Sequence, residues 1–343
     1  MAIIENFDFT VMEKVLFFLF FILQLLLTAR AQQAEPAKLF RFYEDNDFLN
    51  IRGHGTDKAY TNGVRLDLFY QRKRPSRLFI DHMMPKAGNN SIDTYGWSVM
   101  QMMVTPSNLT IPDYQSNDYP YSGALFVTHS LSSYNKTKKY NFQTELVAGI
   151  RGPASFARQT QVWIHHLIHD ERPMGWQNQC TTKFLLNANF VTEKSLVAFK
   201  QVIEVIGGAQ ITAGTMTNSM TIYPLIRIGK MSPYFNGFLS QFSTSSRDQK
   251  HKKLQFYFIA KPKFTFLATN AIMHGGIQRS RQTGGVPEPA SSAGINHFLA
   301  EVDFGTVIAT NNFGISYTQK PTTAYNKGLY SHNVGNISLY FKW

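Results

Sequence analysis

Cysteine is almost absent from this chain of 343 residues, since Cys180 is the only one. An internal disulfide is therefore excluded, and the fold must be stable without one. A Gly-x-Ser-x-Gly element is also missing, so nothing supports a nucleophilic serine on a hydrolase elbow. Charged residues make up only 16% of the chain, which is few for a soluble domain.

Long apolar runs are missing too, with one exception near the N-terminus. The run from Val15 to Leu27 precedes an Ala-Arg-Ala ending at Ala31, which is typical of a secretory signal. It is too short to span a bilayer, which needs about 20 residues. We expect a signal peptide over 1–31 and an outer-membrane barrel domain over 32–343. Which of the first two methionines starts translation stays open.

The net charge of +12 is compatible with two kinds of acidic partner, nucleic acid or a membrane surface. A secretory signal argues against nucleic acid. An acidic, phosphate-bearing membrane surface is the better partner.

Apolar and polar residues alternate with a period of two in many parts of the chain. On the stretch 64–70, four residues including Leu66 and Leu68 share one face, and the last residues up to Trp343 alternate in the same way. Repeated alternation over about ten residues is typical of transmembrane barrel strands. The sequence predicts an all-β fold, a closed antiparallel transmembrane β-barrel of about 12 strands with a short helix in an extracellular-side loop. A soluble β-sandwich is the alternative.

The predicted strands are even in number, as closure of a bacterial barrel requires. They cover 39–48, 60–70, 95–104, 121–133, 140–150, 182–192, 197–216, 221–231, 254–272, 297–309, 312–319 and 332–343. If the N-terminus is periplasmic, every odd-numbered connection lies on the extracellular side. These are 49–59, 105–120, 151–181, 217–220, 273–296 and 320–331.

The third outward connection holds the densest group of chemically capable side chains. Gln161 to Asp170 contains no Gly or Pro, and Pro173 then follows, so we expect a short helix with a sharp exit. Gln161, His165 and His169 would share one helical face, because residues four apart are neighbours. The alternative is a packed connector with solvated histidines.

An acidic cluster, Glu44-Asp45-Asn46-Asp47, lies at the end of the first predicted strand. Such side chains are costly in lipid unless they face a polar interior or bind a cation, and oxygen ligands suit calcium. A solvated strand end is the alternative. The stretch 104–123 contains several turn residues, and loop structure is the favoured interpretation there.

Together these residues resemble a known family, the lipid A 3′-O-deacylases of the outer membrane. The resemblance runs in order along most of the mature chain. It rests on Glu44-x-Asn46-Asp47, Thr56-Asp57, Tyr60-Thr61-Asn62-Gly63, Thr105-Pro106, Tyr119-Pro120-Tyr121-Ser122-Gly123, and the helix region with Gln161, His165, Pro173, Gly175-Trp176 and Gln179.

The resemblance implies a twelve-stranded barrel with its active site between the wall and a short helix, near the outer leaflet. It also implies a calcium-dependent esterase that removes the 3′-linked acyloxyacyl group of lipid A. The residues that match the family's functional ones are His165, Asn46, Asp47, Thr61 and Glu171. A lysine of the best-studied type of this family is not matched, because Leu109-Thr110-Ile111 occupies its region.

These assignments give a specific mechanism as the expectation. His165, with a reference pKa near 6.5, acts as the general base for water. Calcium, held by Asp47, Asn46 and Glu171, stabilises the developing charge. Thr61 orients water or substrate. The partners are lipid A or lipopolysaccharide in the outer membrane, and a monomer is expected; the alternative is a non-catalytic barrel, a porin or structural scaffold.

Overall fold

The computed structural model describes residues 38–51, 57–200, 202–236, 254–274, 294–310 and 312–343. The expected signal peptide over 1–31 and the motif residue Thr56 lie outside the described residues. Among the described residues, no helix is long and apolar enough to cross a membrane.

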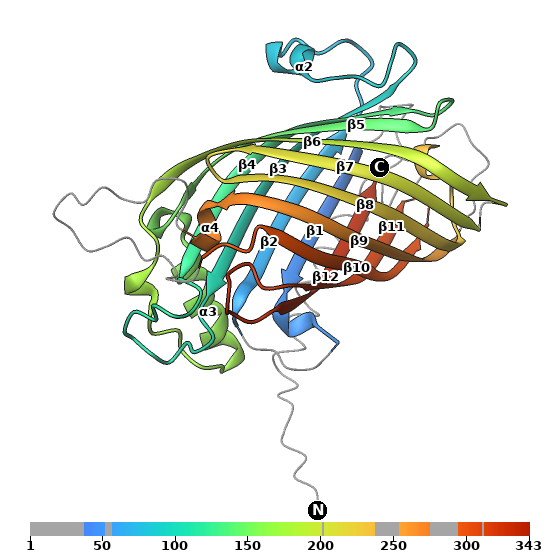
Figure 1. The fold of residues 1–343 in the computed structure, drawn as a ribbon. Coiled ribbons are helices and arrows are strands. Elements are labelled where there is room, and N and C mark those ends of the chain that lie inside the picture. The colour runs from blue at the N-terminus through green and yellow to red at the C-terminus, as the bar shows by residue number, and fades with distance from the viewer. Residues whose placement is uncertain (1–37, 52–56, 201, 237–253, 275–293, 311) are drawn as a thin grey trace, which may run out of the picture.

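Twelve antiparallel strands form a closed barrel in which each strand pairs with its neighbours in the sequence (Figure 1). The strands are β1 (Lys38–Asn46), β2 (Ala59–Tyr70), β3 (Ile92–Thr105), β4 (Ser122–Asn135), β5 (Tyr140–Arg151), β6 (Lys183–Phe199), β7 (Ile203–Gly214), β8 (Thr217–Lys230), β9 (Gln255–Asn270), β10 (Phe298–Ala309), β11 (Phe313–Thr322) and β12 (His332–Lys342). The predicted fold class is confirmed.

Closure occurs between the first and the last strand, as the aromatic end of the chain predicts. Phe40 of β1 lies opposite Phe341 of β12 in antiparallel register. Lys38 and Trp343 exchange two backbone hydrogen bonds, of 3.0 and 3.1 Å. No sheet edge is left unpaired between these strands, which is what a bilayer requires of a barrel.

The predicted boundaries are wrong in one region. The sequence predicts strands over 182–192 and 197–216, whereas β6 continues to Phe199 and the chain turns at Lys200. Lys200 adopts a left-handed φ of 46°, so a tight turn forms without glycine. The expected outward connection 217–220 is instead the start of β8.

Several short helices occupy the connections. They are η1 (Asp47–Leu49), α2 (Phe79–Met83), η2 (Pro153–Ser155), α3 (Ala157–Ile168), η3 (Trp176–Asn178), η4 (Tyr234–Asn236) and α4 (Ala271–His274). The predicted helix is α3, which begins one turn earlier than expected and ends where His169 takes a left-handed φ of 59°. The sequence did not predict α2 or α4.

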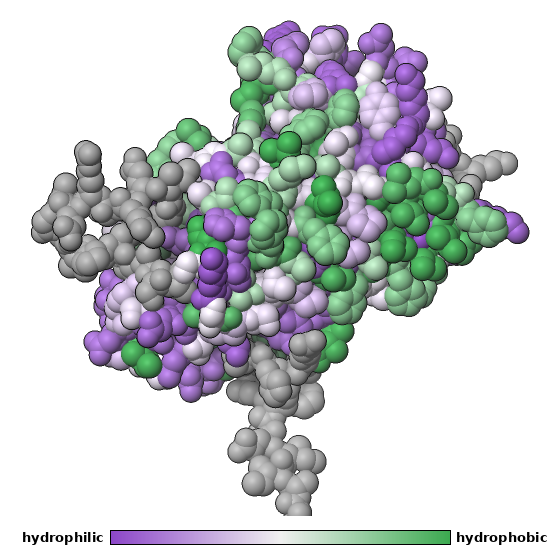
Figure 2. Space-filling view, in the orientation of Figure 1, coloured by the Kyte–Doolittle hydropathy of each residue, from purple (hydrophilic) through white to green (hydrophobic). Residues whose placement is uncertain are grey.

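The alternation of exposed and buried residues along β2 distinguishes the outer face of the wall from the face that lines the barrel interior. Leu66 and Leu68 are 45% and 42% exposed, whereas Asp67 between them is buried. The Asp67 carboxylate accepts hydrogen bonds from Arg41 and Arg65, both at 2.7 Å, inside the barrel. Apolar residues therefore face outward and polar residues inward, as in a transmembrane barrel. Figure 2 shows apolar residues over the strands and hydrophilic residues gathered near the two ends.

The barrel lumen is filled at one end by η4. Tyr234 and Phe235 are buried and share one cluster with Tyr134 of β4 and Val307 of β10, strands on opposite sides of the twelve-stranded wall. The Tyr234 hydroxyl donates a 2.5 Å hydrogen bond to Glu193 of β6. Side chains from η4 thus close the interior from wall to wall.

The two ends of the barrel differ. The connections that carry η1, α3 and α4 lie at one end, and α2 lies at the other, together with η4, the turn at 136–139 and the short connections from β6 to β7 and from β10 to β11. Figure 1 shows α2 and α3 at opposite ends. In bacterial barrels the long loops are extracellular and the short turns periplasmic.

Candidate active site

The helix α3 packs against the outer face of the wall, over the ends of β3 and β4. Met103 of β3 and Tyr121 share a buried cluster with Ala157 and Trp176. Met103 is on the same face of β3 as Trp97, which is 44% exposed. The helix therefore covers the face of the wall that also carries the exposed apolar side chains.

Gly123 permits this close approach. A Cβ atom at Gly123 would lie 2.3 Å from the Cβ atom of Ala157 and 2.5 Å from Oγ of Ser155, closer than such contacts occur. The Gln101 side chain of β3 donates a 2.7 Å hydrogen bond to the Ser155 carbonyl, which ties the start of the helix to the wall. The glycine in the Tyr-Ser-Gly motif thus positions α3.

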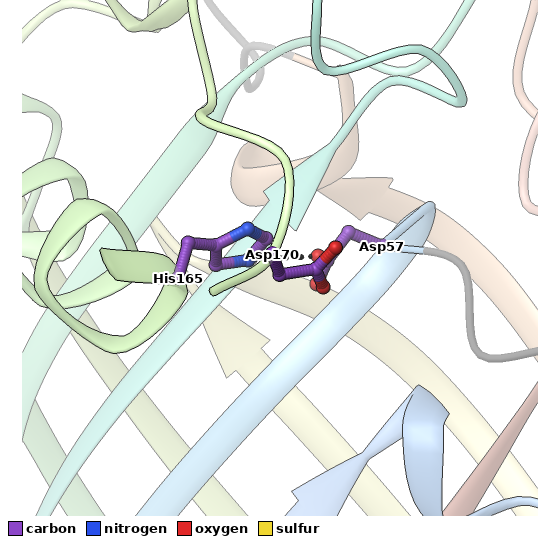
Figure 3. A group of neighbouring side chains, drawn as sticks. All are labelled: Asp57, His165 and Asp170. Atoms are coloured by element: carbon purple, nitrogen blue, oxygen red, sulfur yellow. Dashed lines mark ion pairs between the residues drawn. The ribbon is translucent and has the colours of Figure 1, made fainter. Parts of the chain in front are cut away.

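His165 projects from the buried face of α3 toward the loop between β1 and β2. Its Nδ1 atom donates to the backbone carbonyl of Glu171 at 2.6 Å, and its Nε2 atom lies 2.9 Å from Oδ2 of Asp57. Figure 3 shows the ring beside Asp57 and Asp170. One ligand atom from each of these three residues lies within 4.8 Å of the others, so they form a group able to hold a metal ion.

The surroundings of His165 favour its charged form. Burial lowers the pKa of His165, but the hydrogen bond and negative charge of Asp57 oppose this, and the Glu171 carbonyl and Asp170 charge add to them. The net result is a pKa above the ordinary histidine value. Asp57 therefore stabilises the imidazolium form of the ring through Nε2.

Asp47 lies at the end of β1, where η1 turns the chain. The Asn46 side chain accepts a 2.9 Å hydrogen bond from the Phe48 backbone N–H and so caps η1. The buried Asp47 carboxylate accepts a hydrogen bond from the Lys58 backbone N–H at 3.1 Å. Burial, together with the negative charge of Asp57, raises the pKa of Asp47 to about 8.

Thr61 lies in a β-bulge between β2 and β3, where the register shifts between Tyr60 and Asn62. Its buried hydroxyl lies 2.6 Å from the hydroxyl of Thr105. Bulges commonly redirect side chains next to active sites. This contact joins the Tyr-Thr-x-Gly and Thr-Pro elements, which are far apart in the sequence.

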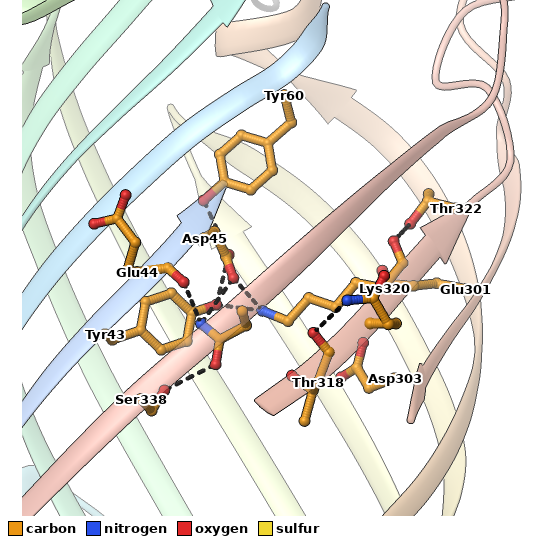
Figure 4. A network of polar contacts seen from close by, with 12 residues as sticks. Tyr43, Glu44, Asp45, Tyr60, Glu301, Asp303, Thr318, Lys320, Thr322 and Ser338 are labelled. Atoms are coloured by element: carbon orange, nitrogen blue, oxygen red, sulfur yellow. Dashed lines mark hydrogen bonds and ion pairs between the residues drawn. The ribbon is translucent and has the colours of Figure 1, made fainter. Parts of the chain in front are cut away.

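The bulge also explains the neighbours of Thr61 in that motif. Tyr60 points into the barrel, where its hydroxyl donates to Asp45 at 3.1 Å (Figure 4). A Cβ atom at Gly63 would lie 1.9 Å from the Tyr60 hydroxyl, so only glycine leaves room for that ring. Asp45 also accepts hydrogen bonds from Tyr43 at 2.6 Å and from Lys320 at 2.8 Å. This interior network holds the strand end that carries Asp47.

Gln161 lies one helical turn before His165 on the same buried face. Its Oε1 atom accepts a 2.7 Å hydrogen bond from the indole N–H of Trp176. Its amide nitrogen is buried and has no hydrogen-bond partner among the described residues. An unsatisfied buried donor is uncommon in a native structure and is often explained by a functional role.

The structure brings some of the predicted site residues together. Asp57 contacts His165 at 2.9 Å and its charge acts on Asp47 at the end of β1, while Thr61 lies on β2, the strand next to β1. Glu171 contributes its backbone carbonyl to His165, while its side chain is exposed. The roles of Asn46 and Glu171 as direct metal ligands stay predictions.

Three residues of the site, Gln161, Asp57 and Asp170, were given no role from the sequence. Asp57 was part of a motif without a role, and Asp170 lay inside the predicted helix segment. No spacing in the sequence shows that either carboxylate meets His165. The adjacent His166 and His169 are exposed. The expectation that His169 shares a helical face with Gln161 and His165 is wrong, because α3 ends at Ile168 and His169 takes a left-handed φ.

Comparison with known proteins identifies the family. A family model described as outer membrane protein LpxR matches residues 16–343. The chain belongs to the LpxR family. The resemblance to outer-membrane lipid A deacylases is confirmed, and so is the location in the bacterial outer membrane.

One solved structure supports this assignment at the level of the fold. LpxR from Salmonella typhimurium is 16% identical, with a TM-score of 0.69, over 88% of this chain and 99% of that one. The β domain of the Bordetella autotransporter BrkA gives a TM-score of 0.42 at 8% identity, over 89% of this chain and 98% of that one. No curated protein matches the chain.

Proposed function

We propose that this protein hydrolyses the 3′-linked acyloxyacyl ester of lipid A in the outer leaflet of the outer membrane. The observation that carries the proposal is the position of His165, which lies beside Asp57 on the buried side of α3, against the outer face of the wall. A lipid in the bilayer reaches that face without entering the barrel. The LpxR family membership supports lipid A as the substrate.

The hydrogen bonds of His165 fit the role of a general base. Donation from Nδ1 to the Glu171 carbonyl fixes the tautomer in which Nε2 of the neutral ring carries the lone pair. Nε2 contacts Asp57 in this structure, so it would accept a proton from water once that carboxylate turns to the cation; the hydroxide then attacks the ester carbonyl carbon. The imidazolium, stabilised by Asp57, then returns the proton to the leaving alkoxide as the C–O bond breaks.

The residues also fit a calcium ion, which stays a proposal. Asp47 is a buried carboxylate that accepts from a backbone N–H, and the nearby charge of Asp57 disfavours its ionised form in the absence of a cation. Carboxylate oxygens are the ligands that calcium prefers. Asp47 and Asp57 would hold the ion, with Asn46 orienting the former. A bound calcium ion would supply positive charge next to the ester carbonyl.

Two further residues complete the proposed site. The unpaired amide nitrogen of Gln161 is a donor for the carbonyl oxygen as negative charge develops on it. The hydroxyl of Thr61, held by Thr105, orients water or substrate. Both act by positioned hydrogen bonds in a buried place, where such bonds are stronger than in water.

The experiment that tests the function is mass spectrometry of lipid A. Cells that produce the protein should contain lipid A lacking the 3′-linked acyloxyacyl group, and cells producing the His165→Asn variant should not. Unchanged lipid A, with the folded protein present in the outer membrane, would refute the proposal.

The alternative function, a pore, is disfavoured by η4. Tyr234 and Phe235 meet residues of opposite strands in the lumen and occupy the path that ions would take. Purified protein in planar bilayers should therefore show no steady open-channel conductance. A large, stable conductance would favour the porin interpretation instead.

A further inference from the structure

The connection between β2 and β3 folds back over the outside of the barrel, at the end opposite the candidate active site. Its helix α2 contributes Asp81, whose Oδ1 atom lies 2.5 Å from Nε2 of His129 on β4. His129 is on the outer face, since its ring lies 4.3 Å from that of Trp97, which is 44% exposed. The backbone N–H of Ala87 donates to Ser133 at 2.9 Å.

These contacts fix which side of α2 faces the wall. Asp81 is buried, and Met84 packs in a cluster with Tyr95 and Leu131. The opposite side carries apolar residues that face solvent. Their exposed fractions are 41% for Leu78, 78% for Phe79, 38% for Ile80 and 69% for Met83. Exposed apolar residues gathered in one place indicate an interaction surface.

Basic residues lie immediately beside this apolar surface. Arg72, Lys73, Arg74 and Arg77 are all exposed, in a stretch of six residues that contains no acidic residue. A segment with exposed apolar side chains and a basic flank is typical of helices that lie in the interface of a membrane.

An aromatic pair marks where the interface lies. Tyr70 and Tyr95 stack at the end of the outer wall, with ring centroids 6.1 Å apart. The Arg72 guanidinium lies over both rings, 5.4 and 5.2 Å from their centroids. Tyr95 is covered by the α2 segment, and Tyr70 is the partly exposed ring, of the kind found at the level of lipid headgroups. The segment with α2 starts directly beyond this level.

We propose that Phe79, Ile80 and Met83 insert into the lipid leaflet at this end of the barrel, and that the neighbouring arginine and lysine residues bind the phosphates of anionic phospholipids. The apolar surface continues the exposed apolar belt of the wall, which includes Val99 and is already the lipid-facing surface. The charge complements anionic headgroups. The short turns place this end at the periplasmic side, whose leaflet consists of phospholipid.

The test measures insertion in the full-length protein refolded into vesicles. Phe79→Cys and Met83→Cys would be labelled with an environment-sensitive fluorophore, since the natural Cys180 is buried. The vesicles would contain phosphatidylcholine with or without phosphatidylglycerol. The emission of both labels should shift to shorter wavelength, and a nitroxide carried on lipid acyl chains should quench it. Asn90→Cys is the matched control, because Asn90 is exposed in the same connection and should stay aqueous.

The charge is tested separately with the variant R72Q/K73Q/R74Q/R77Q. Spin-labelled phosphatidylglycerol should be immobilised by the unsubstituted protein more than spin-labelled phosphatidylcholine. The variant should lose this preference while keeping the heat-modifiable migration of a folded barrel. Full retention of the preference would overturn the headgroup assignment.

Two outcomes of the fluorescence test would overturn the insertion. Labels at positions 79 and 83 that behave like the label at Asn90 would show that α2 stays in water. Blue-shifted labels that the lipid-borne nitroxide does not quench would show that α2 is covered by protein, such as a second copy of the chain. Neither outcome affects the proposed deacylation, which is measured on lipid A.

Discussion

Nε2 of His165 lies 2.9 Å from Oδ2 of Asp57, and this contact joins the helix α3 to the loop between the first two strands. It joins two elements that are more than 100 residues apart in the sequence, and it puts the only buried histidine of α3 next to a carboxylate. The proposed chemistry depends on this pair.

Replacement of His165 tests the base directly. His165→Asn should lower the rate of release of the 3′-acyloxyacyl group by about a hundredfold or more, the usual contribution of a positioned base. His166→Asn is the matched control and should cost much less, because His166 is exposed on the next position of the helix. Equal losses from the two variants would indicate a structural role for α3 only. The assay uses purified lipid A in detergent at fixed calcium.

The pH dependence follows from the raised pKa of His165. The proposed mechanism uses the neutral ring, so the rate should rise as the pH passes upward through the pKa of His165. In calcium-free protein, the midpoint of the His165 titration should lie above the ordinary histidine value. Asp57→Asn removes the negative charge that raises the pKa of His165, while burial still lowers it. Its midpoint should therefore move to lower pH, even where its maximal rate is reduced. A midpoint that does not move would contradict the assigned ion pair.

The calcium proposal is tested at Asp47. Asp47→Ala should abolish calcium-dependent activity and leave a heat-modifiable barrel, because closure depends on strand pairing and not on this side chain. Asp113→Ala, at an exposed carboxylate of a loop at the same end, should keep its calcium dependence. Full activity of the Asp47 variant in a calcium chelator would exclude the role.

The packing of α3 is tested at Gly123. Gly123→Ala places a methyl group 2.3 Å from the Cβ atom of Ala157, so the helix must move away from the wall. A displacement of about 1 Å can cost a hundredfold in rate, so activity should fall by roughly that factor in a folded barrel. Gly314→Ala is the control, since the nearest atom to a Cβ there lies at 3.5 Å. Undiminished activity of the Gly123 variant would show that the position of the helix is not critical.

The fold could be predicted from the sequence because the signals for strands are local. Alternation of apolar and polar residues predicts strands, and the paired ends at Lys38 and Trp343 follow from closure. The turn at Lys200 was missed because β6 and β7 continue the same alternation through a residue type that carries no turn signal. The bulge at Thr61 was not predicted, because the alternation of apolar and polar residues gives no sign of a single extra residue in a strand.

The candidate site could be predicted only in part, because spacing along the sequence reveals some of its contacts and not others. His165 and Gln161 share a face by helical spacing, and both are buried in the structure. Asp57 meets His165 only through tertiary packing, so no spacing could reveal it. Glu171 serves His165 through a backbone carbonyl, which any residue type at that position supplies. Direct roles for its side chain and for that of Asn46 stay predictions.

The placement of α3 against the outer face of the wall, through Gly123 and Ala157, has a kinetic consequence. Substrate that arrives along that face travels by two-dimensional diffusion and is never dissolved in bulk water. The quantity that sets the rate is then the mole fraction of lipid A in the surrounding surface, and not its molar concentration. Dilution of lipid A with inert detergent or phospholipid, at a constant total amount of lipid A, should slow the enzyme for that reason alone.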